Sequence, residues 1–258
     1  MRLMKRILSA AAVLALSASL LVGCSSGTAS SVPVSASSAA ESTVSSVEET
    51  ASSAVDENAA AAAQLLNDLT GSYQELWPVI LADEYKQTWL DDCTALVGEE
   101  NAEAAFEKLS SMVTSDVYGE DAVEAYANGG GAYFCGFTNS LATLTFDGET
   151  STISGTDKDG NVLFSHTYHY IGMEPVHGLY EFESDDADSG EFTYFFLAPD
   201  TSAETYHIEF RYGSDADALS QYDAGDYAYW LASGISTDCD QTMIDNCIEL
   251  FCTENLAG

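Results

Sequence analysis

The sequence predicts a mainly β fold, a small antiparallel barrel with helices before and after it in the chain. About eight short runs of strand-type residues lie between residues 132 and 231, with turn residues between them. Helical spacing of apolar residues precedes these runs, over residues 59–112, and returns over residues 238–254. Eight antiparallel strands can close into a barrel whose interior is filled by side chains or holds one small ligand.

The region before the strands is predicted to be helical. Over residues 59–95, apolar side chains recur at intervals of three and four, which favours one buried helical face. Pro78 marks a break or a first turn within this region, and a further helix is expected over residues 101–112. The glycines of residues 129–131 then end the helical part.

Turn residues separate the predicted strands, and Asp157-Lys158-Asp159-Gly160 is the clearest of these turn signals. The final helix is expected to start at Asp238 or Asp240, because a carboxylate can accept hydrogen bonds from the first free N–H groups of a helix. The strands are predicted over residues 132–138, 142–147, 151–154, 162–171, 176–183, 191–197, 205–212 and 227–231.

The N-terminus has the pattern of an export signal. Three basic residues, Arg2, Lys5 and Arg6, precede the apolar run of residues 7–22, which is short for a membrane span. Cys24 follows Leu-Val-Gly directly, and this arrangement resembles the lipobox of bacterial lipoproteins. The resemblance implies that residues 1–23 are a signal peptide, that Cys24 carries diacylglycerol, and that the lipid is the only membrane attachment. A plain signal peptide with a coincidental cysteine is the alternative.

Residues 24–58 are predicted to be a disordered linker. They consist mainly of Ser, Ala, Thr, Val and Glu and include no aromatic residue, so they cannot bury enough apolar surface to offset chain entropy. The globular domain is therefore expected over residues 59–258, a length sufficient for one domain with its own core.

The chain is strongly acidic, with a formal net charge of −35. Without residues 1–23, four basic residues remain against 42 acidic ones. Such a charge excludes nucleic acids and anionic membrane surfaces as electrostatic partners, and it concentrates cations near the protein. Solubility at a cell surface would explain the same composition.

The runs over 191–197 and 205–212 contain the candidate metal ligands. On an extended strand His207 and Glu209 point the same way, and Asp200 lies on the loop just before them. An imidazole and two carboxylates can bind a divalent metal ion, and protons should compete with the metal as His207 titrates. Two alternatives remain: a solvated strand face, or a structural salt bridge between Glu209 and Arg211.

Other polar residues give weaker signals. His166 and His169 differ by three and should face opposite sides of a strand, whereas His177 could reach the same barrel end as His207. The acidic segment 185–191 resembles a calcium loop but is better explained as a hairpin turn. Beyond Cys24 there are five cysteines, and one or two long-range disulfides are expected in an exported protein, without an assignment of partners. No common enzyme motif occurs, so the protein is expected not to be an enzyme.

Several segments, in order and approximate spacing, resemble the ZinT family of periplasmic zinc-binding proteins, which also occur fused to streptococcal zinc-uptake lipoproteins. The matching segments are residues 71–81, 168–171, 179–183, 194–200 and 207–213, together with Trp230. The resemblance implies a lipocalin-like (calycin) barrel with flanking helices over residues 59–258. The three zinc-binding histidines of the family fall on Asp200, His207 and Glu209, so this chain keeps one histidine of the three.

Together, these observations predict an extracytoplasmic lipoprotein that binds a divalent metal ion, with zinc as the expected cofactor. Its partners would be the cation and a metal-uptake transporter near which it recruits or buffers the metal. The alternative is a metal-free calycin barrel that binds a small organic or glycan ligand at a mouth lined by tyrosines.

Overall fold

The computed structural model describes residues 57–126, 132–199 and 207–257. Its strands are β1 (Gly71–Glu75), β2 (Thr143–Asp147), β3 (Thr152–Thr156), β4 (Val162–Met173), β5 (Tyr180–Ser184), β6 (Tyr194–Leu197), β7 (His207–Gly213) and β8 (Ala232–Ser236). Its named α-helices are α3 (Leu76–Ile80), α4 (Lys86–Val97), α5 (Glu99–Ser111), α6 (Glu120–Tyr126), α7 (Ala216–Leu219) and α8 (Gln241–Leu256). Another helix covers residues 57–68, and 3-10 turns lie at Asp83–Tyr85 and Gly190–Phe192.

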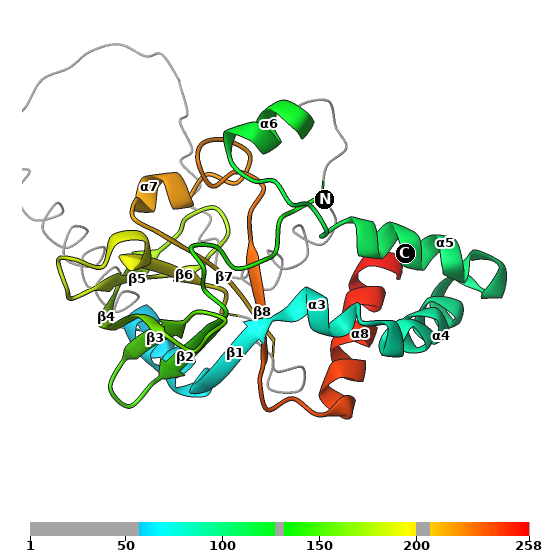
Figure 1. Ribbon diagram of the computed structural model, residues 1–258, viewed down its shortest axis with the longest axis horizontal. Helices are drawn as coiled ribbons and strands as arrows, with labels where there is room; N and C mark the ends of the chain where they lie inside the picture. Colours follow the sequence, from blue (N-terminus) through cyan, green and yellow to red (C-terminus); the bar gives the residue numbers. More distant parts are fainter. Residues whose placement is uncertain (1–56, 127–131, 200–206, 258) are drawn as a thin grey trace, which may run out of the picture.

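The strands form a closed antiparallel barrel. Each strand pairs with its neighbour in sequence, and β8 returns to pair with β1. Figure 1 shows the barrel on one side of the molecule and the helices α4, α5 and α8 on the other. The predicted fold class, an antiparallel barrel with flanking helices, is therefore confirmed.

Aromatic side chains fill the interior of the barrel. Alternate residues of β7, which are Ile208, Phe210 and Tyr212, are buried inside it, as the period of two in a strand requires. The ring of Tyr212 stacks on Phe195 at 5.4 Å between centroids and meets Trp230 edge-on at 4.9 Å. Ring packing of this kind adds to the burial of apolar area and holds the strands in register.

The helix over residues 57–68 packs against the barrel. Its residues Leu65 and Leu66 are buried in the same apolar core as β1 and β2. The helix approaches the β2–β3 turn so closely that a Cβ added at Gly148 would lie 2.4 Å from the Cα of Asn67. Glycine at this turn therefore allows the backbone of the helix to approach.

Helices α3, α4, α5 and α8 enclose a second apolar core, which we call the helical cluster. Trp89 of α4 lies at its centre, fully buried, and its indole N–H donates to the carbonyl of Ile80 at 2.7 Å. Phe251 of α8 packs edge-on against both Trp77 and Trp89. Of the two expected caps of α8, Asp238 and Asp240, the cap is Asp240, whose carboxylate accepts from the N–H of Met243 at 3.0 Å.

Two predicted strands are wrong and one strand was missed. Residues 132–138 make only isolated bridges at Phe134, and the predicted strand at 227–231 is replaced by β8, which starts at residue 232. The missing strand is β1, which interrupts the region predicted to be helical. The apolar pattern was misleading because Leu69, Tyr73 and Leu76 are spaced like one face of a helix. All three are buried, but they belong to a turn, a strand and a short helix respectively.

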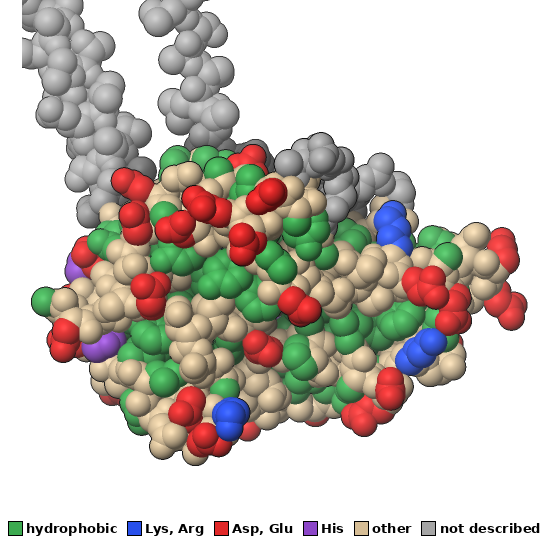
Figure 2. Space-filling model, turned by 45° about the horizontal axis from the view of Figure 1, so that its top comes forward, with side chains coloured by type: hydrophobic (Ala, Val, Ile, Leu, Met, Phe, Trp, Pro, Cys, Tyr) green, Lys and Arg blue, Asp and Glu red, His purple; other side chains and the backbone are tan. Residues whose placement is uncertain are grey.

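The segment between β7 and β8 folds over the outside of the barrel. It contains α7 and continues through residues 220–231, and the connection with α6 lies on the same side in Figure 1. Among the described residues, no helix is both long and apolar enough to cross a membrane. Acidic side chains are spread over the face shown in Figure 2, where basic side chains are few, as the composition predicts.

Candidate functional site

The two described candidate ligands, His207 and Glu209, lie on the outer face of β7. His207 is paired with Ile235 and Glu209 with Ser233 of β8, whereas the alternate residues Ile208 and Phe210 face the barrel interior. The two side chains thus share one face at the start of β7, as predicted. Asp200 falls in residues 200–206 and lies outside the described residues.

The start of β7 lies beside the segment that leads to Asp200. On the side away from β8, the N–H of Ala198 donates to the carbonyl of Glu209 at 3.0 Å, so residues 198–199 continue alongside the strand. Burial lowers the pKa of His207 to about 4, so its imidazole is neutral at neutral pH. Neutral imidazole is the form that binds a metal ion.

Two thiols lie near Glu209, and sequence reasoning did not connect them with it. Burial, and then the charge of Glu209, raise the pKa of Cys135 and raise that of Cys247 to about 12. Cys247 belongs to α8, and nothing in the sequence indicated that it would lie near Glu209. Within residues 57–126, 132–199 and 207–257, no group of three or more His, Cys, Asp or Glu side chains is arranged to hold a metal ion.

Arg211 is the next residue on the same face of β7, and its role is structural. Its guanidinium is fully buried and donates to the carbonyl oxygens of Leu219, Gln221 and Tyr227. The guanidinium also lies 4.2 Å from the centre of the Tyr222 ring. Arg211 thus attaches the β7–β8 connection to the barrel. These carbonyl oxygens take the place of Glu209, which the sequence suggested as a salt-bridge partner of Arg211.

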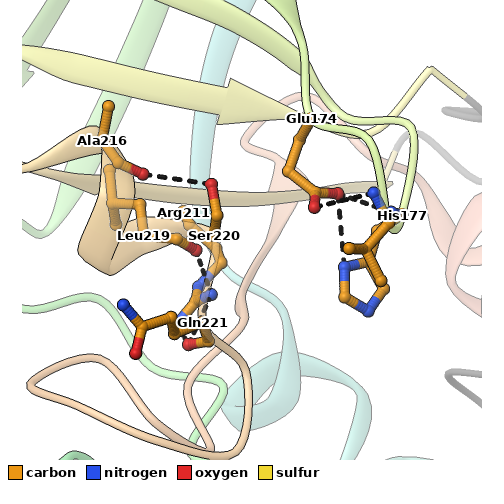
Figure 3. A network of polar contacts seen from close by, with 8 residues as sticks. Glu174, His177, Arg211, Ala216, Leu219, Ser220 and Gln221 are labelled. Carbon is orange, nitrogen blue, oxygen red and sulfur yellow. Dashed lines mark hydrogen bonds and ion pairs between the residues drawn. The ribbon is translucent and has the colours of Figure 1, made fainter.

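A second polar group lies at the turn between β4 and β5 (Figure 3). Glu174 is fully buried, and its carboxylate accepts from the N–H groups of Val176 and His177. The Nδ1 of His177 lies 3.3 Å from the same carboxylate, and its ring packs on Tyr222 at 3.7 Å between centroids. Burial lowers the pKa of His177, while the nearby Glu174 acts in the opposite direction.

This turn lies at the barrel end where β7 begins, since Leu197 pairs with both Tyr180 and Phe210. His177 therefore reaches the expected end of the barrel, where its ring packs on Tyr222. Nothing in the local sequence indicated Glu174 as a buried partner, because Glu-Pro-Val-His-Gly has the composition of an exposed turn. The two hydrogen bonds that its carboxylate accepts from N–H groups of the turn identify Glu174 as a residue that stabilises the turn.

The remaining histidines are paired with aspartates on the surface. His166 and His169 hydrogen-bond Asp186 and Asp185 at 2.8 Å and 2.7 Å. They lie on opposite faces of β4, as predicted, because the residues between them alternate between buried and exposed. The acidic segment after β5 is a turn leading to Gly190–Phe192, in agreement with the hairpin interpretation.

The five cysteines beyond Cys24 are all free thiols in the structure. All five lie in or against the helical cluster, and four of them are buried there. The long-range disulfides expected from the sequence are therefore not formed in this structure.

No protein-family model matches the chain, and no curated protein sequence matches it. Among solved structures, it is similar to the Zn(II)-bound ZinT-like domain of Streptococcus pneumoniae AdcA, with a TM-score of 0.44 and 13% identity, over 70% of this chain and 87% of that domain. It is also similar to Zn(II)-bound AdcA from the same organism, with a TM-score of 0.41 and 12% identity, over 70% of this chain and 34% of AdcA. Similarity at this level does not bear on ligands or partners.

Proposed function

We propose that this chain is an extracytoplasmic lipoprotein that binds a divalent metal ion, with zinc as the expected metal, and that it is not an enzyme. The observation that carries the proposal is the placement of His207 and Glu209 on one face at the start of β7, next to the segment that leads to Asp200. The proposed ligands are His207, Glu209 and Asp200, of which Asp200 lies outside the described residues.

The chemistry of this donor set suits a divalent metal. Zinc accepts imidazole nitrogen and carboxylate oxygen at about 2.0–2.2 Å, and the lowered pKa of His207 keeps its imidazole in the binding form at neutral pH. A set with two carboxylates is less selective for zinc than three histidines and would also accept manganese or iron. The acidic chain would raise the cation concentration near the site.

The proposed membrane attachment rests on the N-terminal sequence. Cys24 would carry the lipid, and residues 24–58 would connect it to the domain. A flexible chain of that length spans on the order of 30 Å, which would hold the domain close to the membrane surface and to an uptake transporter. Replacing Cys24 by alanine should release the protein from the membrane fraction of the expressing cells.

The organic-ligand alternative has less support from the barrel interior. The rings that face it contact one another, as in the 4.0 Å stacking of Phe164 on Phe192 and the packing of Tyr212 on Trp230. A small-molecule ligand inside the barrel would have to displace these buried rings.

The test is metal content by mass spectrometry of the full chain after exposure to equimolar Zn, Mn, Fe and Ca. The variant His207→Ala/Glu209→Ala should lose the stoichiometric metal that the natural chain retains. The control His166→Ala/His169→Ala removes two histidines that are paired with surface aspartates, and it should keep the metal. Absence of bound metal in the natural chain, or metal that persists in the first variant, would contradict the proposal.

The pH dependence refines this test. If His207 had the ordinary pKa of a histidine, metal affinity would already fall between pH 7.5 and pH 5, as the sequence suggested. The pKa of about 4 moves proton competition at His207 below that range, so affinity should change little down to pH 5 and fall towards pH 4.

A further inference from the structure

The strongest candidate beyond metal binding is a pair of cysteines between two helices. Cys93 of α4 and Cys252 of α8 are both fully buried in the helical cluster, and their sulfur atoms are 4.0 Å apart. They are separated by 159 positions in the sequence, so their contact depends on the packing of the two helices. We propose that Cys93 and Cys252 form a disulfide that links α4 to α8 when the chain folds in an oxidising compartment.

The separation of the sulfur atoms is compatible with this bond. A disulfide has an S–S length of about 2.05 Å, so the two atoms must approach by about 2 Å. Side-chain rotation together with a small shift of the helices supplies a movement of that size. The two helices pack directly on each other, and the hydroxyl of Thr88 in α4 donates to the carboxylate of Asp245 in α8 at 3.4 Å.

The other three thiols have different neighbours. The Sγ of Cys135 lies 4.0 Å from the carbonyl of Tyr133, and both Cys135 and Cys247 are near the carboxylate of Glu209. Cys239 is partly exposed. Cys247 and Cys252 lie on different sides of α8, one towards β7 and the other towards α4, so α8 presents a single thiol to Cys93.

The reaction is an exchange with an external disulfide, either a small-molecule disulfide or an oxidised thiol–disulfide exchange protein. The thiolate of one cysteine attacks a sulfur of the external disulfide and releases one external thiol. The thiolate of the second cysteine then attacks the protein sulfur of the mixed disulfide and expels the other external thiol. Two protons and two electrons pass from the cysteine pair to the external disulfide.

Burial determines when this exchange can occur. It raises the pKa of both thiols, so the folded protein contains little of the reactive thiolate. The bond therefore forms while the helices are still packing, and afterwards the same burial protects it from reductants. The proposed export of the chain would supply the oxidising compartment, but the inference rests on the contact between α4 and α8.

The test is disulfide mapping of the full chain refolded with oxidised glutathione. Free thiols are alkylated in denaturant, the unreduced protein is digested, and the peptides are analysed by mass spectrometry. We expect one linked pair containing Cys93 and Cys252, with Cys135, Cys239 and Cys247 alkylated. Alkylation of all five cysteines beyond Cys24, or a linked pair of Cys239 with Cys247, would overturn the inference.

A second measurement separates the bond from simple packing. The natural chain reduced in denaturant and refolded with reductant should melt about 5–10 °C below the oxidised natural chain, because the bond constrains a long loop of the unfolded chain. The variant Cys93→Ala should show no such dependence on reductant, and the control Cys135→Ala, which removes another buried thiol, should keep it. Equal melting temperatures of the oxidised natural chain and of the natural chain reduced in denaturant and refolded would contradict the proposed bond.

Discussion

The barrel and the helical cluster lie side by side in one chain and fill their interiors with different side chains. The barrel core contains stacked and edge-on rings from almost every strand, among them Phe195, Phe210 and Tyr212. The helical cluster has fewer rings, and it contains the buried thiols of Cys93, Cys135, Cys247 and Cys252. The helices pack around these small thiols, whereas the barrel interior is filled by rings together with aliphatic side chains such as Ile208.

This difference gives the two regions different chemistry. The barrel core is inert apolar packing that holds the strands in register. The helical cluster contains groups that can react or bind, and it covers the outer face of β7 and β8, where Glu209 and Ser233 lie. The boundary between the two regions is therefore where the chain places its candidate chemistry.

The largest effect is expected from deleting one buried indole in each region. Trp230 and Trp89 are both fully buried, and each donates its indole N–H to a carbonyl, of Gly136 and Ile80 respectively. Trp230→Ala should lower the free energy of unfolding by about 3–5 kcal/mol, and Trp89→Ala should lie at the lower end of that range. Urea denaturation measures both values.

The same two variants should also differ in which elements lose protection from amide hydrogen exchange. Trp230→Ala should speed amide hydrogen exchange in strands all around the barrel, because a closed sheet shares its interior packing. Trp89→Ala should speed exchange mainly in α4, α5 and α8. Equal patterns of exchange in the two variants would show that the two cores unfold as one unit.

The next effect concerns the connection that covers the barrel. Arg211→Met removes the donor to the carbonyls of Leu219, Gln221 and Tyr227 and should cost about 2–4 kcal/mol, since buried acceptors lose their partners. Limited proteolysis should then cut within residues 214–229. Arg211→Lys keeps the charge and part of the hydrogen bonding, so it should lower the free energy of unfolding by less. If both variants lose the same free energy, the hydrogen bonds to several carbonyls are not the reason for the loss.

A pH effect should distinguish the turn at Glu174 from the rest of the barrel. Burial lowers the pKa of His177 in the folded state, so the unfolded state binds more protons once the pH falls below about 6.5. Stability contributed by this group is therefore present above that pH and is lost as the pH falls towards the folded pKa. His177→Gln should reduce that decline, measured as urea midpoints from pH 7.5 to pH 5.

The smallest effect is expected at the helix caps. Asp240 caps α8 of the helical cluster, and Asp215 caps the short α7 on the barrel. Asp240→Ala should cost about 1 kcal/mol, whereas Asp215→Ala should cost less, because the buried Arg211 also holds the end of α7. Equal costs, measured by thermal unfolding, would show that Arg211 adds nothing to that helix.

Several features could be predicted from the sequence because they depend on short-range patterns. The hairpin turn at Asp157–Gly160 is one, since the Asp157 carboxylate accepts from the N–H groups of Asp159 and Asn161 and Gly160 has a φ of +81°. The cap of α8 and the shared face of His207 and Glu209 are others. Each depends on the side chains of a few neighbouring residues and on the period of one element.

The features that the sequence missed depend on contacts between distant segments. Strand β1 was interpreted as helix because its apolar spacing fits both structures, and only its pairing with β2 and β8 distinguishes them. The proximity of Glu209 to two thiols and the bonds of Arg211 depend on which segment covers β7.

By itself, the sequence determined the β-rich barrel class, the flanking helices, the acidic surface and the face on which His207 and Glu209 lie. These follow from composition and from periodic burial, which are local properties of the chain. Only the tertiary structure decided that Arg211 attaches the β7–β8 connection, that Glu174 is buried, and that Cys93 meets Cys252 across 159 positions. Such contacts arise when closed strands and packed helices bring remote residues together, and no local pattern specifies which residues will meet.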